Sequence, residues 1–123
     1  MACPFCNPDP DVIVVKSDLA YARYDIQPVS PGHLLLIPFR HVASAFDLTD
    51  AERLALARLA GDARAIVDHD HHPDGYNIGV NIGEAAGQAI MHAHVHFIPR
   101  YRGDAPHPGG VTHVKAAGRG GEG

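Results

Sequence analysis

The sequence predicts an α+β fold in which an antiparallel sheet of about five strands packs against one main helix. Two observations carry this prediction. Short apolar runs stand on both sides of a single long helical pattern, and the connections between neighbouring runs are short enough for local antiparallel pairing. With 123 residues, the chain can bury a core of its own within one domain.

The predicted strands are rich in β-branched, aromatic or other apolar residues and are bounded by turn residues. The segment QPVSPG, residues 27–32, is such a turn, because proline and glycine favour backbone conformations that strands rarely use. Strands are expected at residues 12–15, 19–24, 33–39, 76–82 and 92–98, with a further brief strand at 111–114.

The main helix is expected to begin after Thr49. Glu52 follows three residues later, which is the spacing of a capping box, and the acidic residues around it suit the positive end of a helix. The helix should fade near His69, with Pro73 beyond it. Its apolar stripe, at spacings of three and four, consists of Leu56, Leu59, Ala60, Ala63, Ile66 and Val67.

The domain is expected at residues 1–103, followed by a partly flexible, Gly- and Pro-rich tail at 104–123. The net charge of −4 argues against a general nucleic-acid binder. There is no run of about 20 apolar residues that could cross a bilayer, and the first residues lack the pattern of a signal peptide. We therefore expect a cytoplasmic protein whose partners include neither nucleic acid nor a membrane.

Three histidines alternate in the segment MHAHVHFIPRY, residues 91–101. In a strand, His92, His94 and His96 would share one face, while the apolar residues between them face the core. At about 3.3 Å per residue, the outer two are roughly 13 Å apart, so one ion with bonds of about 2 Å cannot easily hold all three. A solvated polar face is the alternative interpretation. Imidazole can also attack phosphorus or donate protons near neutral pH.

Four blocks of the sequence, in order, resemble the histidine-triad (HIT) superfamily of nucleotide hydrolases and transferases. They are DIQPVSPGHLLLIPFRH (25–41), DLTDAE (47–52), GYNIGVNIGEAAGQ (75–88) and GQAIMHAHVHFIPR (87–100). The resemblance covers roughly residues 3–102. It implies a HIT-like half-barrel that forms a homodimer and acts on a purine nucleotide.

The resemblance also implies roles for individual residues. His94 would be the nucleophile that becomes nucleotidylated on the α-phosphorus, and His96 would contact the bridging or leaving oxygen. The substrate-binding positions would be Asp25 at the ribose hydroxyls, Asn81 and Gln88 near the phosphate, and His33 near the pocket. Because Asp25 and Asn81 stand beside turns and Gln88 stands in a loop, turn or loop formation is the alternative for each of these three.

The two cysteines form the motif CPFC at residues 3–6. A redox function would need a strand before the motif and a helix starting at it, and neither is predicted here. A structural zinc needs four ligands. The HIT resemblance implies that these are Cys3, Cys6, His41 and His92, which would separate the job of His92 from those of His94 and His96. An empty, reduced motif is the alternative.

The implied function is cleavage at the α-phosphate of a dinucleoside polyphosphate, a nucleoside phosphoramidate or a related adenylated compound. Transfer to phosphate or another acceptor stays open, as does a zinc store with several ions per chain. Ala89 departs from the family, in which many members carry a hydroxyl at this position, so a catalytically weak nucleotide-binding or interaction module is a further alternative. The segment DHDHHPDG, residues 68–75, could bind a metal, but a polar helix end explains it more simply.

Overall fold

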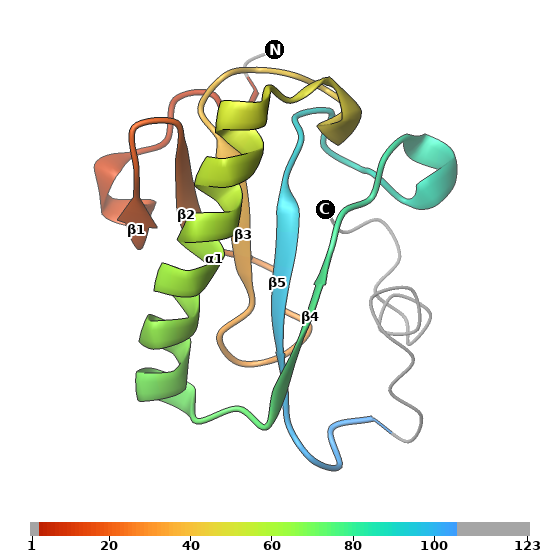
Figure 1. Cartoon of the computed structure of the whole chain (residues 1–123). Coiled ribbons are helices and arrows are strands. Elements are labelled where there is room, and N and C mark those ends of the chain that lie inside the picture. The colour runs from red at the N-terminus through yellow and green to blue at the C-terminus, as the bar shows by residue number, and fades with distance from the viewer. Residues whose placement is uncertain (1–2, 106–123) are drawn as a thin grey trace.

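In the computed structural model of the protein, the described residues are 3–105, and they form a single five-stranded antiparallel sheet with one long helix (Figure 1). The strands are β1 (Val15–Lys16), β2 (Ala20–Tyr24), β3 (Leu34–Pro38), β4 (Gly75–Gly79) and β5 (Val95–Arg100), in the spatial order β1-β2-β3-β5-β4. The helix is α1 (Asp50–His71), and the 3-10 turns are η1 (Pro10–Val12), η2 (Ala45–Asp47) and η3 (Glu84–Ala86). The predicted fold class is confirmed.

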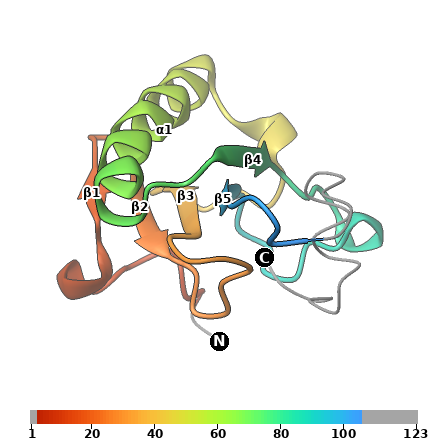
Figure 2. The same cartoon turned by 90° about the horizontal axis from the view of Figure 1, so that it is seen from below.

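Different segments of the chain pack against the two faces of the sheet. Figures 1 and 2 show α1 lying across one face, over β2 and β3. The core on that side contains Ala20, Ala22, Leu34, Leu36 and Phe97 from the sheet and Leu56, Leu59, Ala63 and Val67 from the helix. On the other face, Tyr21, Leu35 and Ile37 pack with Phe5 of the N-terminal segment. Because both faces are covered, every residue of β3 is buried, as its unbroken apolar sequence predicts.

Two predicted strands begin three residues later than expected. In the 12–15 region, Asp9 caps the short turn η1, so β1 contains only two residues. β5 begins at Val95 rather than at His92, because its ladder with β3 ends at the pair Leu36–Val95. The backbone of Pro38 has no N–H to extend that ladder, and its carbonyl accepts a hydrogen bond from the His92 side chain.

The helix and β4 also differ slightly from prediction. The last residue of α1 is His71, two residues beyond the predicted end. It is followed by His72, whose left-handed φ of 54° is typical of a residue just beyond a helix. β4 ends at Gly79, before the expected residue 82. The predicted strand at 111–114 and nearly all of the predicted tail lie outside the described residues. None of the helices within residues 3–105 has the length and apolar character needed to cross a membrane.

Gly32 lets the β2–β3 connection approach the helix closely. Its φ is +89°, a conformation that side chains disfavour, and a Cβ at this position would lie 2.9 Å from a side-chain atom of His71 and 3.1 Å from one of Val67. Any other residue would be strained at this φ and would have to displace the side chains of His71 and Val67. The next residue is His33, so this close approach fixes the start of β3 and the position of one site histidine.

The capping box at the start of α1 is present and is extended by an ion pair. Thr49 Oγ1 accepts from the Glu52 backbone N–H at 3.1 Å, and Glu52 Oε1 accepts from the Thr49 N–H at 2.8 Å. Arg40 donates to both carboxylate oxygens, at 2.8 and 3.0 Å. Glu52 is buried, so these bonds tie the end of β3 to the start of the helix.

Glu52→Gln is expected to lower the free energy of unfolding by about 1–3 kcal/mol at pH 7, because Arg40 loses a charged, buried acceptor. The hydrogen bond from Arg40 lowers the pKa of Glu52 to about 2. Since this value lies below the ordinary one of 4.5, the carboxylate stabilises the fold fully above pH 4.5 and less as the pH falls toward 2. Denaturant unfolding of both proteins across this range should show the difference shrinking.

The matched control for this measurement is Asp50→Asn. Asp50 pairs with Arg53 on the same helix end, but its side chain is fully exposed, so no measurable change is expected. The free energies of unfolding of Glu52→Gln and the unmutated protein should differ less at low pH. If their difference stayed constant down to pH 2, the stabilising role assigned to the Glu52 carboxylate would be contradicted.

Candidate active site

The histidine segment reaches the site from an extended stretch that leads into β5. His96 lies within β5, whereas His92 and His94 precede it. The backbone N–H of Ala93, between them, donates to the carbonyl of Val42 at 2.7 Å. All three histidines are buried, but their rings lie in different surroundings.

His94 is held in one tautomer by the backbone. Its Nδ1 lies 2.7 Å from the carbonyl oxygen of His92. A carbonyl can only accept, so Nδ1 carries the proton and the neutral ring has its lone pair on Nε2. The ring packs edge-on against Phe5 and His96, with ring centres 5.2 and 5.3 Å apart. This arrangement suits a nucleophile that attacks through Nε2.

His96 belongs to a second buried group, with His33 and Asp25. His33 Nε2 lies 3.0 Å from His96 Nδ1 and 3.5 Å from Asp25 Oδ2. The other carboxylate oxygen of Asp25 accepts from the Gln27 backbone N–H at 2.9 Å. Asp25 thus caps the turn, which was the alternative to a role in substrate binding. Its second carboxylate oxygen faces His33.

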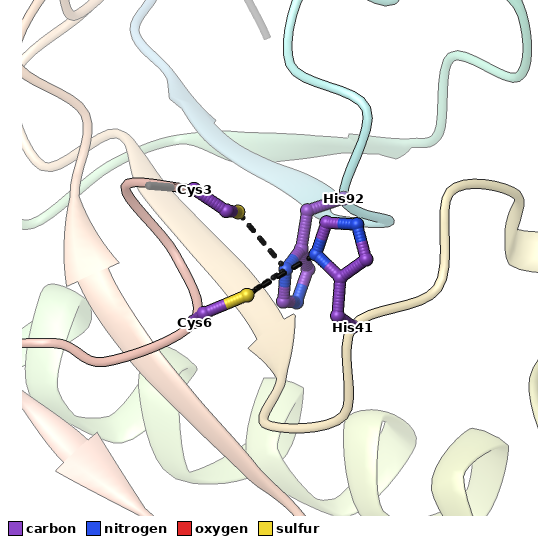
Figure 3. A group of neighbouring side chains, drawn as sticks. All are labelled: Cys3, Cys6, His41 and His92. Carbon is purple, nitrogen blue, oxygen red and sulfur yellow. Dashed lines mark hydrogen bonds between the residues drawn. The ribbon is translucent and has the colours of Figure 1, made fainter. Parts of the chain in front are cut away.

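Cys3, Cys6, His41 and His92 form a compact cluster, with one ligand atom from each lying within 4.8 Å of the others (Figure 3). Cys3 Sγ lies 3.3 Å from His92 Nδ1, and Cys6 Sγ lies 3.1 Å from His41 Nδ1 and 3.7 Å from His92 Nδ1. Tetrahedral zinc, with bonds of about 2.3 Å to sulfur and 2.0 Å to nitrogen, separates its ligand atoms by roughly 3.3–3.8 Å. The donor set and its spacing fit zinc.

His92 is prepared for this role by its second nitrogen. Nε2 lies 2.8 Å from the Pro38 carbonyl and must donate to it, so the lone pair of the neutral ring is on Nδ1, toward the sulfur atoms. Burial lowers the pKa of His92, which favours the neutral ring that a metal requires.

An apolar pocket of about 170 Å³ opens beside Asp25. Phe5 forms part of its wall, and the Phe5 carbonyl accepts a hydrogen bond of 2.7 Å from the buried Tyr21 hydroxyl. The same ring contacts His92 and His94, so one aromatic side chain joins the cysteine loop, the pocket and the central histidine. The pocket is lined by Pro4, Phe5, Arg23, Tyr24, Asp25, Ile26, Leu35 and Ile90.

The arrangement agrees with the family that the motifs indicate. A family model described as the HIT domain matches residues 7–103. The chain belongs to the HIT family.

Relatives within the HIT family carry names of nucleotide enzymes. The chain is 36% identical over 103 residues to a Mycobacterium tuberculosis protein named AP-4-A phosphorylase, covering 83% of this chain and 53% of that protein. It is 35% identical over 92 residues to a Dictyostelium discoideum bis(5'-adenosyl)-triphosphatase, covering 75% of this chain and 62% of the relative. The chain thus spans between about half and two thirds of the length of these relatives.

A solved HIT structure also resembles this chain. This is the crystal structure of a Zn-bound histidine triad family protein from Mycobacterium smegmatis, with a TM-score of 0.76 and 27% sequence identity. The match covers 96% of this chain and 88% of the other. The likeness therefore extends over nearly the whole chain.

Gln88 has a different environment from the one that the HIT resemblance implied. Its side-chain N–H groups donate to the carbonyls of Ala43 and Ile90, and its Oε1 accepts from the Gly83 N–H. Both amide hydrogens are thus committed to the backbone. Gln88 fixes the loop that precedes the histidines and has no hydrogen left to donate to a phosphate.

Asn81 lies in the loop after β4 and is partly buried. A Cβ added at Gly87 would lie 4.0 Å from its amide nitrogen, so Asn81 and this glycine are neighbours across the loop. The structure therefore places Asn81 next to the segment that leads into the histidines.

Sequence analysis did not predict the pocket wall or the pairing of His33 with His96. The pocket residues come from four separate segments, and nothing in the sequence shows that these segments meet. The hairpin of β2 and β3 offered a usable signal: Tyr24 pairs with Leu34, so the next residues outward, Asp25 and His33, must be neighbours.

Proposed function

We propose that this HIT domain is a nucleotidyl hydrolase or transferase that works through a covalent nucleotidyl intermediate on His94. The observation that carries the proposal is the bond between His94 Nδ1 and the His92 carbonyl, which leaves the lone pair on Nε2. Burial beside Phe5 and His96 holds that nitrogen in a defined direction. A fixed lone pair reduces the entropy lost when the ring attacks phosphorus.

The chemistry proceeds in two displacements. His94 Nε2 forms a bond to the α-phosphorus, and the bond from phosphorus to the leaving group breaks with its electron pair on the leaving group. Water then forms the new P–O bond as the P–N bond breaks, which releases a nucleoside monophosphate. If inorganic phosphate replaces water, the product is a nucleoside diphosphate, and the relative named as a phosphorylase supports keeping this second outcome.

The substrate is a purine nucleotide in this proposal. The apolar pocket beside Asp25 suits a flat base, and the carboxylate can accept hydrogen bonds from the ribose hydroxyls. The relatives' names refer to adenosine compounds bridged by phosphates, which supports the same class. Asn81 is proposed to contact the phosphate.

We further propose that Cys3, Cys6, His41 and His92 hold a structural zinc ion. Four protein ligands would complete its tetrahedral shell, so the ion would fix the N-terminal segment beside the histidines rather than bind substrate. The Zn-bound relative supports this assignment. A homodimer, a cytoplasmic location and a tail from residue 104 stay predictions.

Intact mass spectrometry tests the covalent step. After brief incubation with diadenosine tetraphosphate and quenching in base, the unmutated protein is expected to gain the mass of one adenylyl group, which acid then removes. His94→Asn should show no adduct, and His69→Asn, at an exposed histidine of the helix end, should form it normally. An adduct on another residue, or none under conditions of turnover, would contradict the proposal.

A further inference from the structure

The register of the sheet places Arg23 in one row with His96. Leu35 of β3 pairs with Arg23 of β2 on one side and with His96 of β5 on the other. Directly paired residues point to the same face of a sheet, so these three side chains share the face on which Leu35 packs with Phe5. Neighbouring strands are about 4.8 Å apart, which separates the backbones of Arg23 and His96 by roughly 10 Å.

A nucleotide with its α-phosphorus at His94 and His96 would lie across this row. Asp25 shares the face of Arg23, because it follows two residues later, with the two backbones about 7 Å apart. If Asp25 accepts from the ribose hydroxyls, the base lies over Leu35 with its outer edge toward Arg23. All three side chains line the apolar pocket, as this placement requires.

The guanidinium of Arg23 has donors to offer to such a ligand. The side chain is partly buried, and within residues 3–105 no acceptor forms a hydrogen bond or an ion pair with its guanidinium. By contrast, Arg100, which is also partly buried, donates to both carboxylate oxygens of Asp104. A donor that loses water on binding must find an acceptor, so Arg23 favours ligands that bring acceptors into the pocket.

We infer that Arg23 is a specificity residue of the proposed nucleotide site and selects guanine over adenine by donating two parallel hydrogen bonds to the outer edge of the base. This inference deepens the proposed function and rests on it. Adenosine compounds, to which the relatives' names refer, would then be weaker but still usable substrates of this chain.

The two purines differ at the edge that faces Arg23. Guanine presents two neighbouring acceptors, O6 and N7, which match the planar fork of a guanidinium. Adenine presents N7 beside an amino group, and that group is a donor. One N–H of Arg23 would then face another donor inside an apolar pocket and stay without a partner. Hypoxanthine carries the same O6 and N7 pair as guanine, so it should be selected as well.

Calorimetric titration with nucleoside monophosphates tests the selection without reference to catalysis. In the unmutated protein, the dissociation constants of GMP and IMP are expected to be about 5- to 100-fold lower than that of AMP, the effect of one bidentate pair. This comparison needs no variant to fold. A guanidinium that only stacked on the face of the base would bind all three nucleotides about equally.

Variants assign the selection to the side chain. Arg23→Leu should bind GMP and AMP with dissociation constants within about twofold of each other, because neither edge finds a donor. Arg23→Gln should bind AMP at least as tightly as GMP, since an amide can donate to N7 of adenine and accept from its amino group. Arg58→Gln is the matched control at an exposed arginine of α1, and it should keep the original preference.

Several outcomes would overturn the inference. These are equal affinities for GMP and AMP in the unmutated protein, a guanine preference that IMP does not share, and a preference that survives in Arg23→Leu. If none of the three nucleotides binds, the proposed function fails and the inference fails with it. If the preference is found but no His94 adduct forms, the covalent mechanism fails while the role of Arg23 stands.

Kinetics separate selection by binding from a part in the chemistry. The value of kcat/KM for diguanosine tetraphosphate is expected to exceed that for diadenosine tetraphosphate by about the same 5- to 100-fold, with the difference in KM and with similar kcat. A contact to the base is made equally before and during the displacement at phosphorus, so it changes KM alone. A preference that appeared in kcat would overturn the specificity role.

Discussion

His94→Ala is expected to lower kcat on diadenosine tetraphosphate by about four orders of magnitude or more, while adenosine monophosphate still binds. The substitution removes the only group that the proposed chemistry bonds to phosphorus, and the remaining contacts can stabilise charge but cannot form the intermediate. The pocket wall and Asp25 are untouched, so the dissociation constant, measured by calorimetry, should change by only a few fold.

His69→Ala is the matched control, because it removes an imidazole that lies exposed near the end of α1. It should leave both kcat and binding unchanged. Turnover within tenfold of normal in His94→Ala would exclude His94 as nucleophile. Binding without any turnover in the unmutated protein would instead favour the nucleotide-binding module.

Removal of the metal is expected to have the largest effect on stability. An ion bound only by the folded state stabilises it in proportion to the logarithm of its concentration over its dissociation constant. For tightly held zinc in a domain of this size, chelation should lower the melting temperature by roughly 10–20 °C. Calorimetry of the protein with and without a strong chelator measures this, and added zinc should reverse the change.

Metal content identifies the ligands. Elemental analysis is expected to find one zinc ion per chain in the unmutated protein and none in Cys3→Ser or Cys6→Ser. His69→Ala and His71→Ala, in the histidine-rich segment at the end of α1, should retain it. Several ions per chain would support a zinc store, and zinc that survives both cysteine substitutions would disprove the assignment.

Features set by local chemistry could be predicted from the sequence. The start of α1 depends on Thr49 and Glu52, three residues apart, and the structure has the predicted capping box. The start of β5 could not be predicted in this way, because it depends on Pro38, which lies in another strand and ends the shared ladder. The cluster of Cys3, Cys6, His41 and His92 was predicted only from the HIT resemblance, because no local sequence pattern links residue 3 to residue 92.

The hydrogen-bond partners of the buried polar residues also depend on segments that are distant in the sequence. Gln88 gave no sign that the carbonyl of Ala43 would accept one of its amide hydrogens, because Ala43 belongs to a loop far away in the sequence. His33 pairs with His96, and the turn that holds His33 through the backbone N–H of Val29 is recognised only by its prolines and glycine. Such details follow from tertiary packing and require coordinates.

Phe5 belongs at once to the loop between the two cysteines, to the wall of the pocket and to the surroundings of His94. Occupants of the proposed metal and nucleotide sites therefore share one rigid side chain. If a bound nucleotide increases the affinity for the ion by some factor, the ion must increase the affinity for the nucleotide by the same factor. The two effects are equal because the affinities are thermodynamically reciprocal. Loss of the ion is therefore expected to weaken nucleotide binding by that same factor.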